Sequence, residues 1–161
     1  MTSNTIATAG LADPTADPAA DLTAARARNE DVWRRSSRLL YAGQIDEFVG
    51  HWCEDASYEA ALPVPGLPAV ITGHEALHAA FSGLVAGARS IAAHDVRFHQ
   101  TDDPDVAIIE ERLVAELADG SGYENRFIIR VTFRDGRIAD MLEYYGQFAH
   151  QDLLRRLGFG S

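Results

Sequence analysis

The order of elements along the sequence predicts an α+β fold, in which a curved antiparallel sheet wraps around N-terminal helices and encloses a cone-shaped cavity. Two observations support this prediction. Apolar residues recur near the helical period in the first part of the chain, whereas alternation with a period of two dominates from residue 90 onward. Short turn signals separate the later segments, which is typical of an antiparallel meander rather than of parallel βαβ units.

The first 22 residues are predicted to form a flexible arm, and residues 23–161 a single domain. The arm is rich in Ala, Thr, Asp and Pro and shows no convincing periodicity. It has neither the basic start nor the long apolar centre of a secretory signal. The remaining length suits one domain, and a hydrophobic fraction of 47% is enough for a core.

Three helices are predicted ahead of the long strands. The first runs from about Thr23 to Tyr41 and ends before Gly43. A short second helix follows, and its apolar side consists of Ile45, Phe48, Val49 and Trp52. Gly73 opens the third, which contains the stretch "HEALHAAFSGLVAGA".

The predicted strands fall into a short pair and a long meander. Ser57–Leu62 and the stretch "AVITG" form the pair, and the prolines of "PVPGLP" between them do not fit a central strand. The long strands cover residues 90–100, 106–118, 123–134 and 137–147. The turn signals "TDDPD", "DGSG" and "RDG" separate them, and "HQDLLRRLG" is predicted to form a closing helix.

Composition excludes several classes of partner. A net charge of −10 argues against binding to nucleic acid or to an anionic membrane surface. No apolar stretch reaches the roughly 18 residues that a membrane-spanning helix needs. Cys53 is the only cysteine, so an intrachain disulfide or a CxxC site is excluded, and the cytoplasm is the expected compartment.

Strand alternation predicts which side chains point into the fold. In segment 123–134 the inward set includes Asn125 and Phe127, and in segment 106–118 it includes Glu111 and Leu113. In segment 90–100 the apolar set contains His94, which is therefore expected to point inward.

The last strand is ambiguous, because each of its faces carries one acid. Asp140 lies near a turn, where solvent is expected on either face, whereas Glu143 lies in the middle of the strand and is predicted to be buried. Tyr145 shares the face of Glu143, and Tyr58 lies on the apolar face of the first short strand.

Six polar residues are therefore expected among apolar neighbours: Tyr58, His94, Glu111, Asn125, Glu143 and Tyr145. An unpaired buried polar group costs roughly 1–3 kcal/mol, so a core built for packing alone would not contain so many. Their convergence is typical of a small-molecule pocket.

Three stretches carry a resemblance to a known family. They are "ITGHEAL", "HDVRFHQTDDPD" and "YENRFIIRVTFRDGRIADMLEYYGQF". Across roughly residues 28–160 the chain resembles SnoaL-like members of the NTF2-like (ketosteroid-isomerase-like) superfamily, and most closely the phenazine-biosynthesis A/B-type branch. The resemblance implies a cone-shaped α+β barrel with an internal cavity, no metal and no organic cofactor, and a homodimer.

The same resemblance implies roles for particular residues. In the phenazine-type branch an acid on the last strand transfers protons, and that position corresponds to Glu143. The branch also uses a histidine on the third helix, which corresponds to Ala80 here, whereas His74 and His78 do not match it. This departure argues against phenazine condensation, and His94 is the candidate to supply an imidazole instead.

We therefore expect Glu143, His94 and Tyr58 to be catalytic. Glu143 would act as the acid or base, and Tyr58 would donate to a substrate oxygen. The expected substrate-binding residues are Tyr145, Glu111, Asn125, Trp52, Phe127 and Leu113. Each polar member also has a structural interpretation, as a salt-bridged carboxylate, a core histidine or tyrosine, or a hydrogen bond within the cavity.

Two classes of function fit this pattern. The first is a cofactor-free cyclase of secondary metabolism that acts on a small, largely apolar substrate by acid–base catalysis. It would open an epoxide with an internal hydroxyl to form a cyclic ether, or cyclise a polyketide; an epoxide hydrolase and a ketosteroid-isomerase-like isomerase are alternatives. The second class is a non-catalytic small-molecule binding protein. A metal site is not expected, because "HEALH" would need a third ligand and a cleft around its helix.

Overall fold

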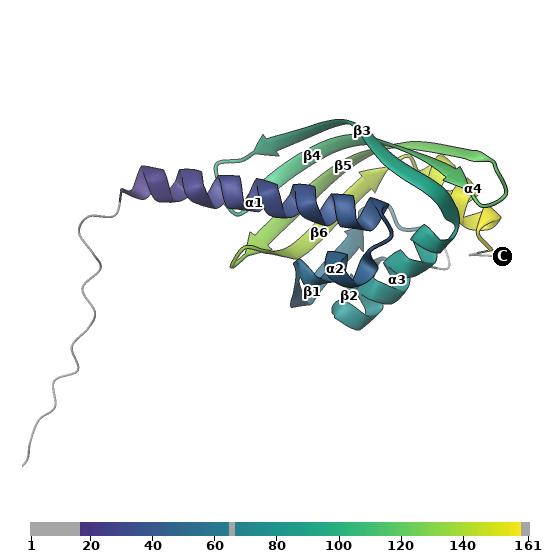
Figure 1. Ribbon diagram of the computed structural model, residues 1–161, viewed down its shortest axis with the longest axis horizontal. Helices are drawn as coiled ribbons and strands as arrows, with labels where there is room; N and C mark the ends of the chain where they lie inside the picture. The colour runs from purple at the N-terminus through teal and green to yellow at the C-terminus, as the bar shows by residue number, and fades with distance from the viewer. Residues whose placement is uncertain (1–16, 65–66, 159–161) are drawn as a thin grey trace, which may run out of the picture.

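The computed structural model of the chain describes residues 17–64 and 67–158. Their helices and strands are α1 (Pro18–Tyr41), α2 (Ile45–Gly50), β1 (Trp52–Ala60), β2 (Val70–Thr72), α3 (His74–Ala86), β3 (Ala88–Gln100), β4 (Val106–Leu117), β5 (Gly122–Arg134), β6 (Arg137–Tyr145) and α4 (Gln147–Arg156). The order of helices and strands agrees with the prediction (Figure 1).

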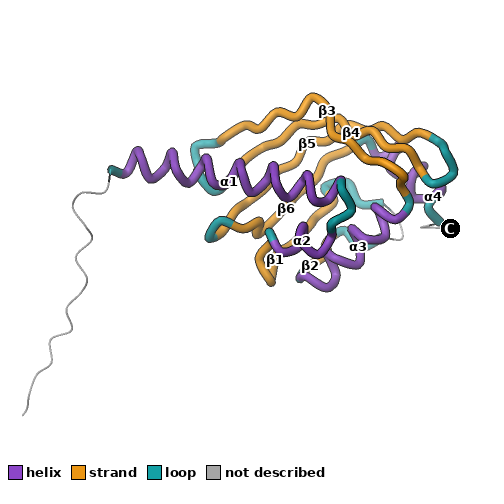
Figure 2. The backbone as a smooth tube through the Cα atoms, viewed as in Figure 1, coloured by secondary structure: helices purple, strands orange, loops and turns teal. Residues whose placement is uncertain are grey.

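One curved sheet of six strands, in the order β2-β1-β6-β5-β4-β3, forms the frame of the molecule. The helices α1, α2 and α3 lie against one of its faces (Figure 2), which confirms the expected cone-shaped α+β fold. Two details differ from the prediction. The sheet is mixed, because β1 pairs in parallel with β6, and it is open, with β2 and β3 at its edges.

The first helix begins earlier than the periodicity predicts. The Asp17 carboxylate accepts a hydrogen bond from the backbone N–H of Ala19, and Pro18 occupies the first helical turn. Both features favour a helix start, so residues 18–22 are helical rather than part of an arm. The rest of the predicted arm, residues 1–16, lies outside the described residues, as do residues 65 and 66 in the proline-rich loop.

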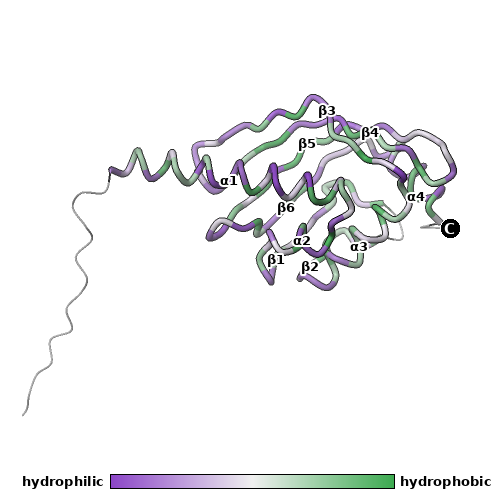
Figure 3. The backbone as a smooth tube through the Cα atoms, viewed as in Figure 1, coloured by the Kyte–Doolittle hydropathy of each residue, from purple (hydrophilic) through white to green (hydrophobic). Residues whose placement is uncertain are grey.

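Apolar side chains gather into two clusters. The larger contains Phe48, Trp52 and Phe81, whose rings meet edge to face or tilted at centroid distances of 4.9–6.1 Å. The smaller contains Tyr123 and Leu153 and lies under α4. Hydrophobic and hydrophilic residues alternate along α1 and the strands (Figure 3), which is how one face of each element reaches these clusters.

The expectation that Trp52 lines a binding pocket is wrong. It begins β1 instead of ending the second helix, and its side chain is fully buried. It lines neither of the two adjoining cavities between the sheet and the helices. Its indole packs against Phe48 and Phe81, so Trp52 belongs to the core.

The expectation that His94 points inward is also wrong, because a β-bulge reverses the faces of β3. His94 pairs with Arg112 on β4, but the next pair is Arg97 with Glu110, so β3 contains one extra residue. Asp95 lies within the bulge with a left-handed φ of 56°. Alternation counted back from the apolar end of the strand therefore assigns His94 to the wrong face, and its side chain is exposed.

No helix within residues 17–64 and 67–158 combines the length and the apolar character that crossing a membrane would require.

The bulge gives a test of this part of the fold. We expect Asp95→Val to lower the free energy of unfolding by about 1–3 kcal/mol, because a β-branched residue is strained at positive φ. Asp95→Gly relieves that strain and should cost less than Asp95→Val, although both variants remove the hydrogen bond that Arg112 donates to Asp95. Urea denaturation measures both variants, and equal losses would contradict the bulge.

Candidate active site

A largely apolar cavity lies between the sheet and the helices. Its walls come from the end of α1, from β1, from α3, from β3 to β6 and from α4, and its accessible volume is about 90 Å³. Phe81, Leu84, Leu113, Phe127 and Leu153 are among its apolar lining, and Leu113 and Phe127 are there as predicted. The polar side chains that line it are Tyr41, Tyr58, Glu111, Tyr123, Glu143 and His150.

Glu143 faces this cavity from β6. It pairs with Ile129 on β5, whose side chain is buried, so both lie on the helix-covered face of the sheet. The Tyr58 hydroxyl donates a 2.9 Å hydrogen bond to Glu143 Oε2. Burial raises the pKa of Glu143 to about 7, the bond from Tyr58 opposes that rise, and the negative charge of Glu111 adds to it.

Asp140, the other acid of β6, lies on the opposite face. Its carboxylate accepts hydrogen bonds from Arg130 and from the Ser57 hydroxyl. The ambiguity that alternation leaves in this strand is thus resolved, because Asp140 bonds to Arg130 and Ser57 whereas Glu143 lines the cavity and bonds to Tyr58.

Glu111 brings a second carboxyl group into the same cavity, from β4. Its side chain is 6% exposed, and Oε1 accepts a 2.5 Å hydrogen bond from the Tyr41 hydroxyl. Oε2 is buried and has no partner among the described residues. Burial raises the pKa of Glu111, and the bond from Tyr41 opposes the rise.

Tyr41 is a site residue that the sequence analysis missed. It is the last residue of α1, and burial together with the carboxylate of Glu111 raises the pKa of its hydroxyl. A signal was present, because Tyr41 lies eight residues after the buried Trp33, a spacing that falls within the apolar stripe of a helix.

The two tyrosine–carboxyl pairs leave matched groups for a ligand. In each pair one carboxyl oxygen is held by a phenol, and for Glu111 the other oxygen, Oε2, is buried without a partner. The charge on Glu111 raises the pKa of Glu143, so the protons of the two groups are coupled. Near neutral pH the pair can therefore hold one proton, an arrangement suited to supplying an acid and a base together.

His150 on α4 supplies the imidazole that His94 does not. Its ring packs against Tyr145 at a centroid distance of 4.3 Å, and its Nδ1 is buried without a partner. Burial lowers the pKa of His150 to about 4, so the ring is neutral at pH 7. The sequence held a signal for it, since Leu153 and Leu154 follow at helical spacing and are both buried.

Asn125 is structural, which corrects its prediction as a substrate-binding residue. Its amide donates to the Gly146 carbonyl and to the Tyr123 hydroxyl, and its Oδ1 accepts from the Gly146 N–H, each at 2.9 Å. It lines neither large cavity. A Cβ on Gly146 would lie 2.5 Å from Asn125 Oδ1, so this approach requires a glycine there.

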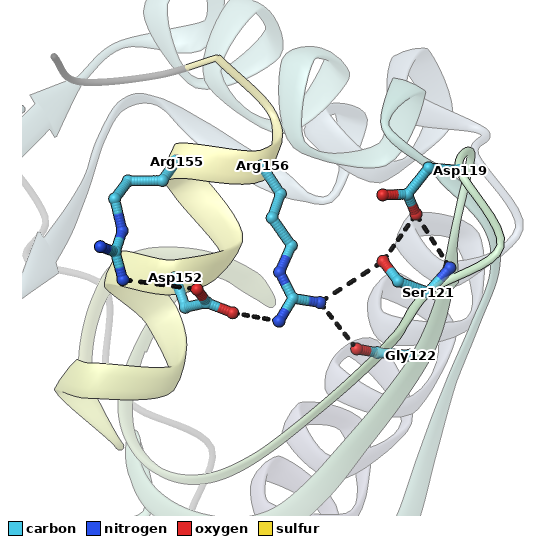
Figure 4. A network of polar contacts seen from close by, with 6 residues as sticks. All are labelled: Asp119, Ser121, Gly122, Asp152, Arg155 and Arg156. Carbon is cyan, nitrogen blue, oxygen red and sulfur yellow. Dashed lines mark hydrogen bonds and ion pairs between the residues drawn. The ribbon is translucent and has the colours of Figure 1, made fainter.

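The Asn125–Gly146 contact fixes the start of α4, and a polar network fixes its end (Figure 4). Arg156 forms an ion pair with Asp152 and donates to the Ser121 hydroxyl and the Gly122 carbonyl, in the turn between β4 and β5. The helix α4, which forms one wall of the cavity, is therefore attached to the sheet at both of its ends.

Packing also brings α4 close to the sheet. A Cβ on Gly87, just before β3, would lie 2.2 Å from a methyl carbon of Leu157 at the end of α4. The glycine thus leaves the space into which Leu157 fits.

A second cavity, with an accessible volume of about 200 Å³, adjoins the first. The two share Tyr58, Phe81, Leu84 and His150 as a common wall. Tyr145, predicted to bind substrate, lines the second cavity rather than the first, and so does Ala80.

Within residues 17–64 and 67–158, no group of three His, Cys, Asp or Glu side chains is placed to hold a metal ion. The chemistry that the described side chains offer is proton transfer in an apolar enclosure, with neutral hydrogen-bonding groups around it.

Comparison with known proteins places this site in a family context. The family model described as "SnoaL-like domain" matches residues 33–141. A search of curated protein sequences gives no match.

Solved structures resemble the whole domain. A phenazine biosynthesis-related protein from Pseudomonas aeruginosa has 19% identity and a TM-score of 0.69, covering 88% of this chain and 92% of that one. SalBIII, an epoxide hydrolase/cyclase-like enzyme in pyran ring formation in salinomycin, has 16% identity and a TM-score of 0.64, with coverages of 75% and 92%. RV0760c from Mycobacterium tuberculosis, in complex with estradiol-17beta-hemisuccinate, has 20% identity and a TM-score of 0.66, with coverages of 76% and 96%. At these identities the likenesses establish the fold.

The raised pKa of Glu143 predicts a pH-dependent cost to stability. The folded pKa is about 7 against an ordinary value of 4.5, so between these values the folded state retains a proton that the unfolded state has lost. The free energy of unfolding should therefore fall as pH rises through this window. Glu143→Gln carries no charge at this position, so its free energy of unfolding should not fall in this way. We expect its stability relative to wild type to increase by about 2–3 kcal/mol as the pH rises from 4.5 to 8.

Chemical denaturation at several pH values measures this difference. Glu59→Gln is the matched control, because Glu59 is a neighbour of Tyr58 on β1 but is exposed on the other face. A stability difference between Glu143→Gln and wild type that does not change with pH would show that the carboxyl group is not held in a costly environment.

Proposed function

This chain belongs to the SnoaL-like domain family, and from that premise we propose that it is a cofactor-free enzyme of secondary metabolism that cyclises a small, largely apolar molecule. The reaction that the site supports best is the opening of an epoxide by a hydroxyl of the same substrate, which yields a cyclic ether. The observation that carries this proposal is the pair of tyrosine-held carboxyl groups, Glu111 and Glu143, in one apolar cavity.

The reaction needs one proton to be taken up and one to be given, and the pair of Glu111 and Glu143 can do both. Ionised Glu111 accepts the proton of the attacking hydroxyl through its free Oε2 while the new C–O bond forms. As the epoxide C–O bond breaks, protonated Glu143 gives its proton to the leaving oxygen, which becomes the hydroxyl of the product. Proton exchange after product release returns the proton from Glu111 to Glu143.

This assignment gives Glu143 the acid step of the reaction. Its pKa of about 7 keeps much of it protonated near neutral pH, and the Tyr58 bond holds its Oε2 at the cavity wall. The raised pKa of Glu111 makes it a stronger base than an ordinary carboxylate when it is ionised. Tyr58 and Tyr41 act as positioning residues that hold the two carboxyl groups in place.

The apolar walls contribute to the rate by restricting the conformation of the bound substrate. A flexible substrate must fold so that its hydroxyl approaches one epoxide carbon from behind, and side chains such as Phe127 and Leu113 would restrict it to that shape. The relatives support this kind of ligand, because SalBIII is described as acting in pyran ring formation and RV0760c was solved with a steroid ester. Cys53, a buried free thiol, is consistent with a cytoplasmic enzyme.

A 4,5-epoxyalkan-1-ol tests the proposal, because attack by its hydroxyl gives a tetrahydrofuran or a tetrahydropyran, whereas attack by water gives a triol. We expect ring formation by the wild type, and a loss of about 10²–10⁴-fold in kcat/KM in Glu143→Gln and in Glu111→Gln. The wild-type kcat/KM should fall as pH rises above about 7, since Glu143 then loses its proton.

Gas chromatography of the products separates the outcomes. Glu59→Gln should behave as wild type, because that carboxylate faces away from the cavity. Triol as the main product would assign epoxide hydrolysis to the site, and unchanged turnover in Glu143→Gln would rule out its role as the acid.

We further propose that the enzyme acts as a homodimer through the outer face of the sheet. Ile128 and Tyr144 are cross-strand partners on that face and are 52% and 48% exposed. Two large apolar side chains side by side among charged neighbours such as Arg126 and Arg130 would suit a second copy of the same surface.

Light scattering after size-exclusion chromatography tests the dimer. We expect the wild type at twice the mass of the chain and Ile128→Lys at the mass of one chain, because a lysine in each copy would bring like charges together. Leu22→Lys is the control, since Leu22 is 44% exposed but lies on α1. A dimer that persists in Ile128→Lys would place the interface elsewhere.

A further inference from the structure

The second cavity differs in chemistry from the one that holds the carboxyl groups. Its outer walls come from β2, α3 and α4 and are formed by aliphatic side chains such as Ile71, Ala80 and Leu154. Among the described residues that line it, none is an acid, a lysine or an arginine. A ligand group that fills it gains from the removal of apolar surface from water and has no charge partner there.

The few polar groups of this cavity gather at one end. Tyr58 and His150 belong to the wall shared with the first cavity, and Tyr145 packs against His150. Tyr58 also donates to Glu143, so the polar end of the second cavity is the end nearest the carboxyl pair. Polarity therefore increases from the aliphatic walls toward the reacting groups.

We propose that the second cavity is a binding subsite for an uncharged, apolar extension of the substrate. The inference rests on the proposed function and defines the substrate class: an elongated molecule whose hydroxyl and epoxide lie beside Glu111 and Glu143, and whose hydrocarbon part passes Tyr58 and His150 into the second cavity. The neutral imidazole and the phenol at the shared wall can accept or donate a hydrogen bond where the two parts of such a molecule join.

The placement of the two cavities fits this arrangement. Four side chains, Tyr58, Phe81, Leu84 and His150, border both spaces, so the cavities lie next to each other at these residues. The second is the larger, with an accessible volume of about 200 Å³ against about 90 Å³ for the first.

A pair of 4-alkylphenols tests the subsite by binding alone, without turnover. The phenol hydroxyl can bond to the carboxyl pair, and the alkyl chain is short in 4-ethylphenol and long in 4-hexylphenol. Each buried methylene contributes about threefold to fourfold in affinity, so we expect 4-hexylphenol to bind wild type at least about 30-fold more tightly than 4-ethylphenol. Isothermal titration calorimetry measures both.

Filling the second cavity should remove the extra affinity of 4-hexylphenol and leave the affinity of 4-ethylphenol unchanged. In Ala80→Phe we expect 4-ethylphenol to bind as in wild type and 4-hexylphenol to gain less than about threefold over it. Ile71→Phe fills the same space from β2 and covers the case in which Ala80→Phe does not fold. Ala79→Phe is the control, because Ala79 is the neighbour of Ala80 on α3 but lines neither cavity.

The outcomes separate this inference from the proposed function. The subsite is refuted if 4-hexylphenol does not bind the wild type. It is also refuted if 4-hexylphenol gains as much affinity over 4-ethylphenol in Ala80→Phe and Ile71→Phe as it does in the wild type. Both results hold whatever reaction the site catalyses. If the gain behaves as expected while Glu143→Gln leaves epoxide cyclisation unchanged, the subsite stands and the proposed reaction falls.

Discussion

The enclosure of two carboxyl groups in one apolar cavity is the constraint around which the rest of this structure is arranged. Burial disfavours their charged forms, and the charge on Glu111 adds to the effect on Glu143. The fold retains them by giving each a phenol, Tyr41 from α1 and Tyr58 from β1. The parallel pairing of β1 with β6 brings Tyr58 level with the last strand, so the unpredicted feature of the sheet topology is what completes the Glu143 pair.

Residues that never meet the ligand set the dimensions of the site. Asn125 bonds to both backbone groups of Gly146, where the chain turns from β6 into α4. Arg156 attaches the other end of α4 to the turn between β4 and β5. Because His150 projects from this helix, the position of the imidazole that lines both of these cavities depends on contacts at both ends of α4.

Much of the site could be predicted from strand alternation, and its failures have physical causes. Glu111, Leu113, Phe127 and Glu143 face the cavity as expected, since β4 and the relevant part of β5 and β6 pair without an irregularity there. His94 was misplaced because an extra residue in β3 reverses the alternation, and no local pattern marks such a bulge. Tyr41 and His150 were missed because helix periodicity identifies an inward face but not the part of it that borders a cavity. The parallel β1–β6 pair was missed because strand partners far apart in sequence leave no local signal.

Gly87 has a consequence for how such a site could diversify. Leu157 seats against it without an intervening side chain, so the separation between α4 and the start of β3 is set by an absent methyl group. Any larger residue there would first have to move the end of the Leu157 side chain, which packs beside the helix that carries His150 and Leu153. A change at this glycine would thus act on the packing around α4 and leave the two carboxyl groups in place.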